Sequence, residues 1–140
     1  MQIIFDSKEK SIVRLDKGDS VLDVLKSLAE KRDTSFVFSI IGAGSMAELG
    51  YYNTGEKRYF SRTFESGHIE ILSCSGNVAW AEDEIIVHAH GVFSNERNEC
   101  FGGHVMKLVI STTGEVVIDW LPQKISKKFD EETGLKLLSV

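Results

Sequence analysis

"EIIVHAHGVF" at residues 84–93 and "HVMKLVIST" at residues 104–112 are two largely apolar, β-branched stretches, and each predicts a strand. The polar segment "SNERNECFGG" at 94–103 lies between them and predicts a loop. Strands that follow each other along a chain are usually neighbours in space. We therefore expect these two strands to lie side by side in one sheet.

Three of the four histidines of the chain lie on these two predicted strands. Side chains alternate along a strand, so His88 and His90 point to the same face. His104 opens the next strand, and the preceding Gly102 and Gly103 would let its backbone approach closely. Three neutral imidazoles with an open fourth position are typical of catalytic zinc, whereas structural zinc has four protein ligands.

The sequence therefore predicts a divalent transition-metal site formed by His88, His90 and His104. Zinc is the ion we expect, although nickel, cobalt and iron also accept imidazole ligands. The alternative is that these are ordinary histidines, each with a hydrogen bond and no ion.

Other residues could complete such a site. Cys100, four residues before His104, is the best thiol candidate for a fourth ligand. Glu70 shares a strand face with His68, so either could act as a ligand, as the partner of a ligand or as a proton carrier. Glu70 is the candidate catalytic residue. The alternative is an exposed Glu–His pair without a role.

The rest of the chain predicts one helix and further strands. "SVLDVLKSLAEKRD" at 20–33 has helical periodicity. Ser20 with Asp23 resembles a capping box, and Asp19 is the competing N-cap. "SFVFSIIG" at 35–42 is continuously apolar, which predicts a strand buried on both faces. Turns are expected at "GAGS", at Gly76–Asn77 and at "TG" 113–114. Further strands are expected at 11–15, 46–52, 57–64, 68–76, 115–121 and 132–140.

This pattern predicts an α+β fold: a single domain spanning residues 1–140, with one main helix and a large antiparallel or mixed sheet. The net charge of −5 argues against non-specific DNA binding, which depends on neutralising phosphates. The basic stretch "KISKKF" at 124–129 is expected to form a solvent-exposed face. "IIGAGS" at 40–45 lacks the third glycine of a dinucleotide-binding loop.

Two cysteines do not form a disulfide framework, and we expect them to be reduced. The N-terminus has no secretory signal pattern, and no apolar run approaches the ~20 residues that cross a bilayer. A cytoplasmic protein is the expectation, with no membrane partner.

The order of "IGAGSMAELGYY", "GHIEILSCSGNVA", "IIVHAHGVFSN" and "FGGHVMKLVI" resembles the plant and prokaryote conserved (PPC) domain, over roughly residues 10–138. The resemblance implies a compact α+β domain that assembles as a homotrimer, with a fold similar to that of acetolactate decarboxylase. The family's three histidines match His88, His90 and His104. Stand-alone prokaryotic members often carry a DNA-binding label.

This chain departs from the family pattern in two places. It has no Arg-Gly-Arg-Pro hook, so the minor-groove DNA binding of the plant members does not carry over. His68 replaces the usual arginine of the "G-R-F-E" block, and Ile69 replaces the aromatic residue.

Three functions follow as hypotheses. The first is a trimeric metal-binding module for protein interaction or regulation. The second is a zinc-dependent lyase or hydrolase that acts on a small carbonyl or ester substrate, with Glu70 as proton carrier. The third is DNA binding. An enzyme should have an open cleft at the histidines, whereas a module should have them closed at a subunit interface.

Overall fold

The computed structural model describes residues 1–65 and 67–140. These residues form nine strands and one helix. In chain order the elements are β1 Gln2–Asp6, β2 Lys10–Asp16, α1 Val21–Arg32, β3 Phe36–Asn53, β4 Arg58–Phe64, β5 Ile69–Ala81, β6 Glu84–Ser94, β7 Cys100–Trp120, β8 Ser126–Asp130 and β9 Leu135–Ser139.

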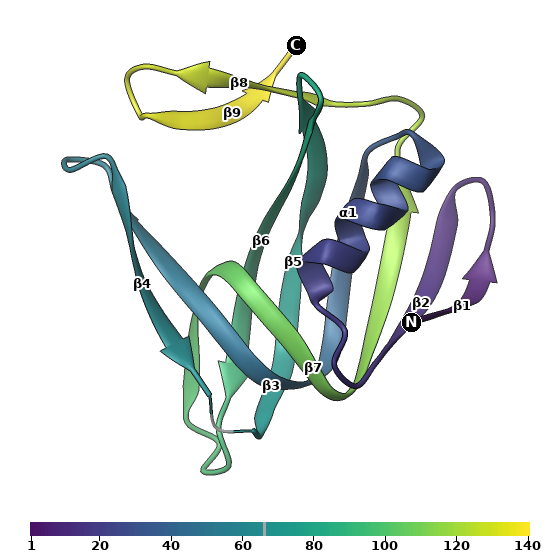
Figure 1. Cartoon of the computed structure of the whole chain (residues 1–140), viewed down its shortest axis with the longest axis vertical. Coiled ribbons are helices and arrows are strands. Elements are labelled where there is room, and N and C mark those ends of the chain that lie inside the picture. Colours follow the sequence, from purple (N-terminus) through teal and green to yellow (C-terminus); the bar gives the residue numbers. More distant parts are fainter. Residues whose placement is uncertain (66) are drawn as a thin grey trace.

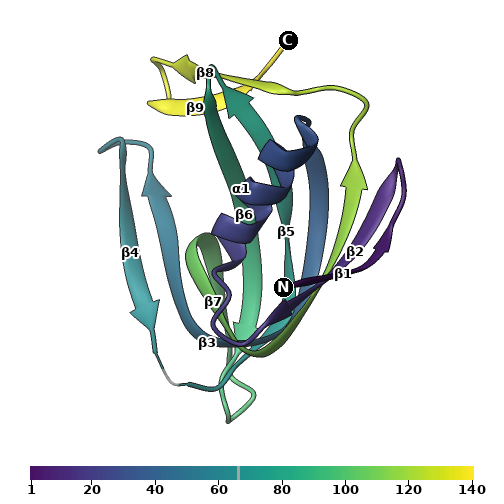
Figure 2. The ribbon, with the colours of Figure 1, turned by 45° about the vertical axis from the view of Figure 1, so that its right-hand side comes forward.

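The strands build one curved sheet, and α1 lies across one of its faces (Figure 1, Figure 2). The main path runs β1-β2-β7-β3-β5-β8-β9, with β4 beside β3 and with β6 between β5 and β7. The pairs are antiparallel except β5–β8, which is parallel at Trp80 and Ser126. This confirms the predicted α+β class and its mixed sheet. None of the described helices has the length and apolarity that crossing a membrane requires.

Helix α1 matches its prediction closely. Val21, Leu25, Leu28 and Ala29 are its buried residues, and they face the sheet. Burial of each large apolar side chain contributes roughly 2 kcal/mol to folding. The helix ends at Asp33, which adopts a left-handed conformation with φ 53°.

The predicted capping box is wrong. Ser20 occupies the N-cap position, but its side chain makes no capping hydrogen bond. The backbone of Ser20 instead forms an isolated bridge with Val109. The neighbouring Asp19 carboxylate accepts from the Asp16 N–H at 2.9 Å. The tertiary pairing of this segment therefore replaces the local cap.

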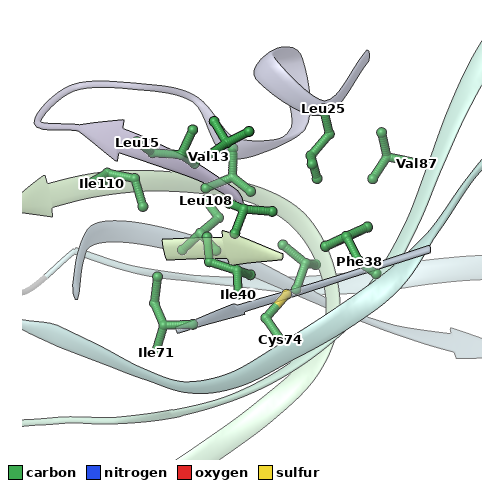
Figure 3. Close-up of a cluster of buried hydrophobic side chains, with 14 of the residues drawn as sticks. Val13, Leu15, Leu25, Phe38, Ile40, Ile71, Cys74, Val87, Leu108 and Ile110 are labelled. Atoms are coloured by element: carbon green, nitrogen blue, oxygen red, sulfur yellow. The ribbon is translucent and has the colours of Figure 1, made fainter. Parts of the chain in front are cut away.

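The hydrophobic core lies between α1 and the sheet face that it covers. Figure 3 shows Leu25 of the helix in one cluster with Phe38, Ile40, Cys74 and Val87 of the strands. Cys74 is 1% exposed, and burial raises the pKa of its thiol to about 12. The thiol is therefore a small core side chain and not a reactive group.

Burial of β3 on both faces, predicted from "SFVFSIIG", is wrong for the single chain. Phe36, Phe38 and Ile40 are buried, whereas Val37 and Ile41 are 42% and 54% exposed. The helix covers one face of the antiparallel sheet and leaves the other uncovered. Apolar residues therefore alternate between the core and an open face.

Three of the predicted turns are absent, because strands continue through them. "GAGS" lies within β3, "TG" at 113–114 lies within β7, and Gly76–Asn77 lies within β5. Glycine here marks close contact of strands and not a chain reversal. A Cβ on Gly42, whose φ is +144°, would lie 2.3 Å from the Thr113 carbonyl oxygen. Gly42 and Gly114 are paired partners, so two long strands bend together at this point.

Several other predicted strands agree with strands of the structure. The predicted strands 11–15 and 84–93 lie within β2 and β6. The predicted strand 57–64 begins one residue later, as β4, and the predicted strand 132–140 is shorter, since β9 spans Leu135–Ser139. The strands β1 and β8 were not predicted from the sequence. The segment β8 belongs to a hairpin with β9 that bears directly on the candidate site.

Candidate metal centre

The three predicted histidines converge at the uncovered face of the sheet. His88 and His90 lie on β6, and His104 lies on β7 directly opposite His90 in register. One ligand atom from each ring lies within 4.8 Å of the others. The Nε2 atoms of His88 and His90 are 3.3 Å apart. The ring centroids are separated by 5.1 to 5.4 Å.

Glycines beside the histidines let the strands come this close. A Cβ on Gly102 would lie 2.5 Å from the carbonyl oxygen of Gly91, and one on Gly103 would lie 3.0 Å from that of Gly50. This agrees with the role expected for the double glycine. On the other edge of β6, a Cβ on Gly76 would lie 1.9 Å from the His88 carbonyl oxygen. Backbone contact on both edges therefore fixes the position of β6.

The surroundings of His88 and His104 favour the neutral form of these two imidazoles. Burial lowers the pKa of His104 to about 4, with smaller effects from His88, His90 and Lys127. Burial, then the charges of Lys127 and His90, also lower the pKa of His88. Neutral nitrogen is the form that binds a metal ion. Three converging imidazole nitrogens, two of them on rings with a lowered pKa, therefore fit a transition metal such as zinc.

The lowered pKa of His104 predicts that the stability of the metal-free protein depends on pH. Below pH 6.5 the unfolded chain protonates His104, whereas the folded chain does so only near pH 4. The unfolded state then binds more protons, so this contribution to stability falls as the pH drops from 6.5 to about 4. Urea unfolding of the His104→Gln variant should show a weaker loss across this window. A loss equal to that of the unmodified protein would contradict the shift.

A cavity of about 560 Å³ lies beside the histidines. It lies between the first residues of β6 and the β8–β9 hairpin, which lies at one end of the molecule above β6 in Figure 1. The hairpin is tied to the β3–β4 hairpin, since Tyr52 donates from its hydroxyl to the Thr133 carbonyl at 2.6 Å. The lining residues are Tyr59, Glu84, Ile86, Val87, His88, His104, Lys127, Gly134, Leu135, Lys136, Leu137 and Leu138.

Sequence reasoning missed two residues at this cavity. The ring centroid of Tyr59 lies 5.0 Å from that of His104, and burial raises the pKa of its phenol. Lys127 is only 9% exposed, so the expectation that 124–129 forms a solvent-exposed face is wrong at this residue. Nothing in the lysine-rich stretch distinguishes Lys127 from its neighbours. Its burial follows from the alternation of β8 and from the position of the hairpin.

Asn77 is a third neighbour that the sequence did not reveal. It lies on β5 opposite His88 in register, and its Oδ1 is buried without a hydrogen-bond partner among the described residues. Such an acceptor beside an imidazole is a candidate to orient the ring when the other nitrogen binds a metal.

The remaining predicted candidates lie elsewhere. Glu70 and Cys100 are both paired with Ser94, on opposite edges of β6, and both are exposed. His68 lies just before β5. Within the described part of the chain, none of these three joins the three-histidine group or lines the cavity. Their predicted roles stay predictions.

Comparison with known families gives a match over most of the chain. The sequence model of the Plants and Prokaryotes Conserved (PCC) domain matches residues 4–122. Comparison with curated proteins found no match.

Solved structures show close likenesses. A protein from Ralstonia eutropha JMP134, which carries a provisional DNA-binding label, is 28% identical with a TM-score of 0.90; the alignment covers 97% of this chain and 94% of that one. A metal-containing protein from Archaeoglobus fulgidus is 27% identical with a TM-score of 0.85, covering 100% and 99%. The α-acetolactate decarboxylase of Bacillus subtilis strain 168 is 17% identical with a TM-score of 0.57. That alignment covers 90% of this chain and 58% of the decarboxylase, and it shows likeness of fold alone.

Proposed function

Because this chain belongs to the Plants and Prokaryotes Conserved domain family, we propose that it is a homotrimeric, zinc-binding module that acts in protein interaction or regulation. His88, His90 and His104 are the proposed ligands. The observation that carries the proposal is their convergence, with one ligand atom of each ring within 4.8 Å of the others. The metal-containing relative from Archaeoglobus fulgidus, 27% identical, supports it.

Self-assembly is supported by the uncovered face of the sheet. Val37, Ile41, Leu72 and Val92 are between 42% and 54% exposed. All four lie on strands that pack the core with their alternate residues. Exposed apolar side chains on one face are typical of a protein–protein interface. His90 lies on this same face, one alternation before Val92. We propose that further copies of this chain cover the face.

Native mass spectrometry of the untagged protein, incubated with zinc and then exchanged into volatile buffer, tests both parts together. We expect an assembly of three chains that carries one zinc ion per chain. The Ile41→Glu variant should be monomeric and still bind zinc, because Ile41 lies outside the three-histidine group. The matched control is Phe129→Glu, which places the same charge at another apolar residue, 65% exposed on β8. A monomeric unmodified protein, or one without zinc, would contradict the corresponding part.

The cavity favours a second candidate, a zinc-dependent lyase or hydrolase. In the single chain, His88 and His104 face a space of about 560 Å³, which is an open cleft and not a closed structural site. A three-histidine site leaves a position for water or a carbonyl oxygen, so a zinc ion there would supply Lewis-acid chemistry. Tyr59 is the phenol beside His104 in this cavity. If the zinc-loaded protein turns over small carbonyl or ester substrates, that result would favour the enzyme function over the interaction module.

DNA binding is the third candidate and has the weakest support. It rests on the label of the 28% identical relative from Ralstonia eutropha. The net charge of −5 opposes it, because phosphate neutralisation supplies most of the non-specific affinity.

We propose that the protein is located in the cytoplasm. The two free cysteines, one of them exposed, suit a reducing compartment.

A further inference from the structure

Lys127 is a buried cation in the cavity beside the histidines. It is 9% exposed, and its Nζ donates to the Lys136 carbonyl oxygen at 3.5 Å, which is a long hydrogen bond. Burial lowers the pKa of its ammonium. A buried charge is costly unless an opposite charge or strong hydrogen bonds offset it.

No carboxylate of the described residues offsets this charge. Of the residues that the structure describes, Glu84 is the one acidic residue that lines the cavity, and its Oε2 accepts from the Lys136 Nζ at 2.5 Å. The cavity thus contains two lysines and one carboxylate that is already paired. One positive charge is left over, and it belongs to Lys127.

Building on the proposed metal site, we propose that this cavity binds a small organic carboxylate. Its anionic group pairs with Lys127, and its apolar body lies against Ile86, Leu135 and Leu137. The rest of the wall includes Val87 and Leu138, so five of the twelve lining residues are aliphatic. Among the described residues, Lys127 is the one lysine of the cavity without a carboxylate partner. Aliphatic side chains beside such a cation suit a monoanion with an apolar body better than a fully hydrated inorganic anion.

The histidines belong to the same cavity. Lys127, His88 and His104 are all among its lining residues. A metal cation held by the histidines would add a second positive charge to this environment. An anion between them would offset both charges. The volume of about 560 Å³ lies within the ~300–1,000 Å³ usual for small-molecule sites.

The feature belongs to this chain and not to the matched family segment. The family match ends at residue 122, and Lys127 lies on β8 beyond it. The hairpin that carries Lys127 is nevertheless firmly placed. Lys57 donates from its Nζ to the Glu131 carbonyl oxygen at 2.6 Å, and Tyr52 donates to that of Thr133.

The test is a calorimetric titration of the cobalt-loaded, untagged protein with benzoate, with its neutral isostere benzamide and with inorganic phosphate. The cobalt absorption spectrum is followed in parallel, because it reports ligands that come near the metal. We expect benzoate to bind at least tenfold more tightly than benzamide or phosphate.

Variants of the two cavity lysines show whether benzoate affinity depends on the charge of Lys127 or only on the shape of its side chain. Lys127→Met keeps the length of the side chain and removes the charge, so benzoate affinity should fall at least tenfold. Lys127→Arg should restore it to within about threefold of the unmodified protein. Lys136→Met is the matched control in the same cavity, and it should change benzoate affinity less than threefold, because Lys136 is already paired with Glu84.

Cobalt content is measured in every sample, which distinguishes failure of this inference from failure of the metal proposal. Equal binding of benzoate and benzamide, or unchanged affinity in Lys127→Met, would overturn the carboxylate site. If phosphate binds more tightly than benzoate, the proposal that the ligand has an apolar organic body is contradicted. If the protein takes up no cobalt, the metal proposal fails. Benzoate binding that depends on Lys127 in the metal-free protein would then still support the anion site, and its absence would overturn it.

Discussion

Alanine at both His88 and His90 will reduce the zinc affinity of this protein by more than about a hundredfold. The two substitutions remove two of the three proposed ligands, whereas loss of a residue that merely orients a ligand already costs about 10- to 100-fold. His90 is exposed and His88 is only partly covered, so the fold should lose less than about 0.5 kcal/mol of stability. Competition with a chromophoric zinc chelator measures the affinity, and urea unfolding measures the stability.

The matched control for this double variant is His68→Ala. His68 is the remaining histidine of the chain, and it lies outside the three-histidine group. Its replacement should leave zinc affinity within about twofold. Retention of zinc by the double variant, or equal loss in the control, would show that the ion binds elsewhere.

Alanine at Gly76 will destabilise the fold by about 3 kcal/mol, at the upper end for overpacking. The added Cβ would lie 1.9 Å from the His88 carbonyl oxygen and 2.9 Å from the Ala89 Cα. These are backbone atoms of a paired strand, so no side chain can rotate away to make room. Since β6 also carries His88, the shift should lower zinc affinity as well. Urea unfolding and the chelator competition measure the two effects.

Gly55→Ala provides the comparison for this prediction. The nearest atom to a Cβ on Gly55 is the Asn53 side-chain Oδ1 at 3.3 Å, in the exposed turn between β3 and β4. This variant should change stability by less than about 0.5 kcal/mol. If Gly76→Ala is as stable as Gly55→Ala, the close contact between β5 and β6 does not constrain the chain as we infer.

The helix and the face that it covers could be predicted because they depend on local periodicity. The apolar stripe from Val21 to Ala29 has no competing strand pattern. The strands around Gly42, Gly76 and Gly114 were harder, because glycine signals both a turn and the close approach of two strands. Only the paired strand decides between these meanings. Local sequence does not identify that strand.

The three histidines could be predicted as a group for a different reason. His88 and His90 need only the two-residue alternation of one strand, and His104 needs only the next strand to be its neighbour. Lys127 and Tyr59 come from other hairpins, so their place in the cavity depends on tertiary packing. Two-sided burial of β3 was wrong for one chain, but it is what assembly through the Val37–Ile41 face would produce.

X-ray absorption spectroscopy of the zinc-loaded, untagged protein tests the three-histidine centre most directly. We predict three imidazole nitrogens at about 2.0–2.1 Å and one further oxygen ligand, without sulfur. A sulfur neighbour at about 2.3 Å would mean that a cysteine binds the ion. A shell of oxygens without imidazole scattering would contradict the site altogether.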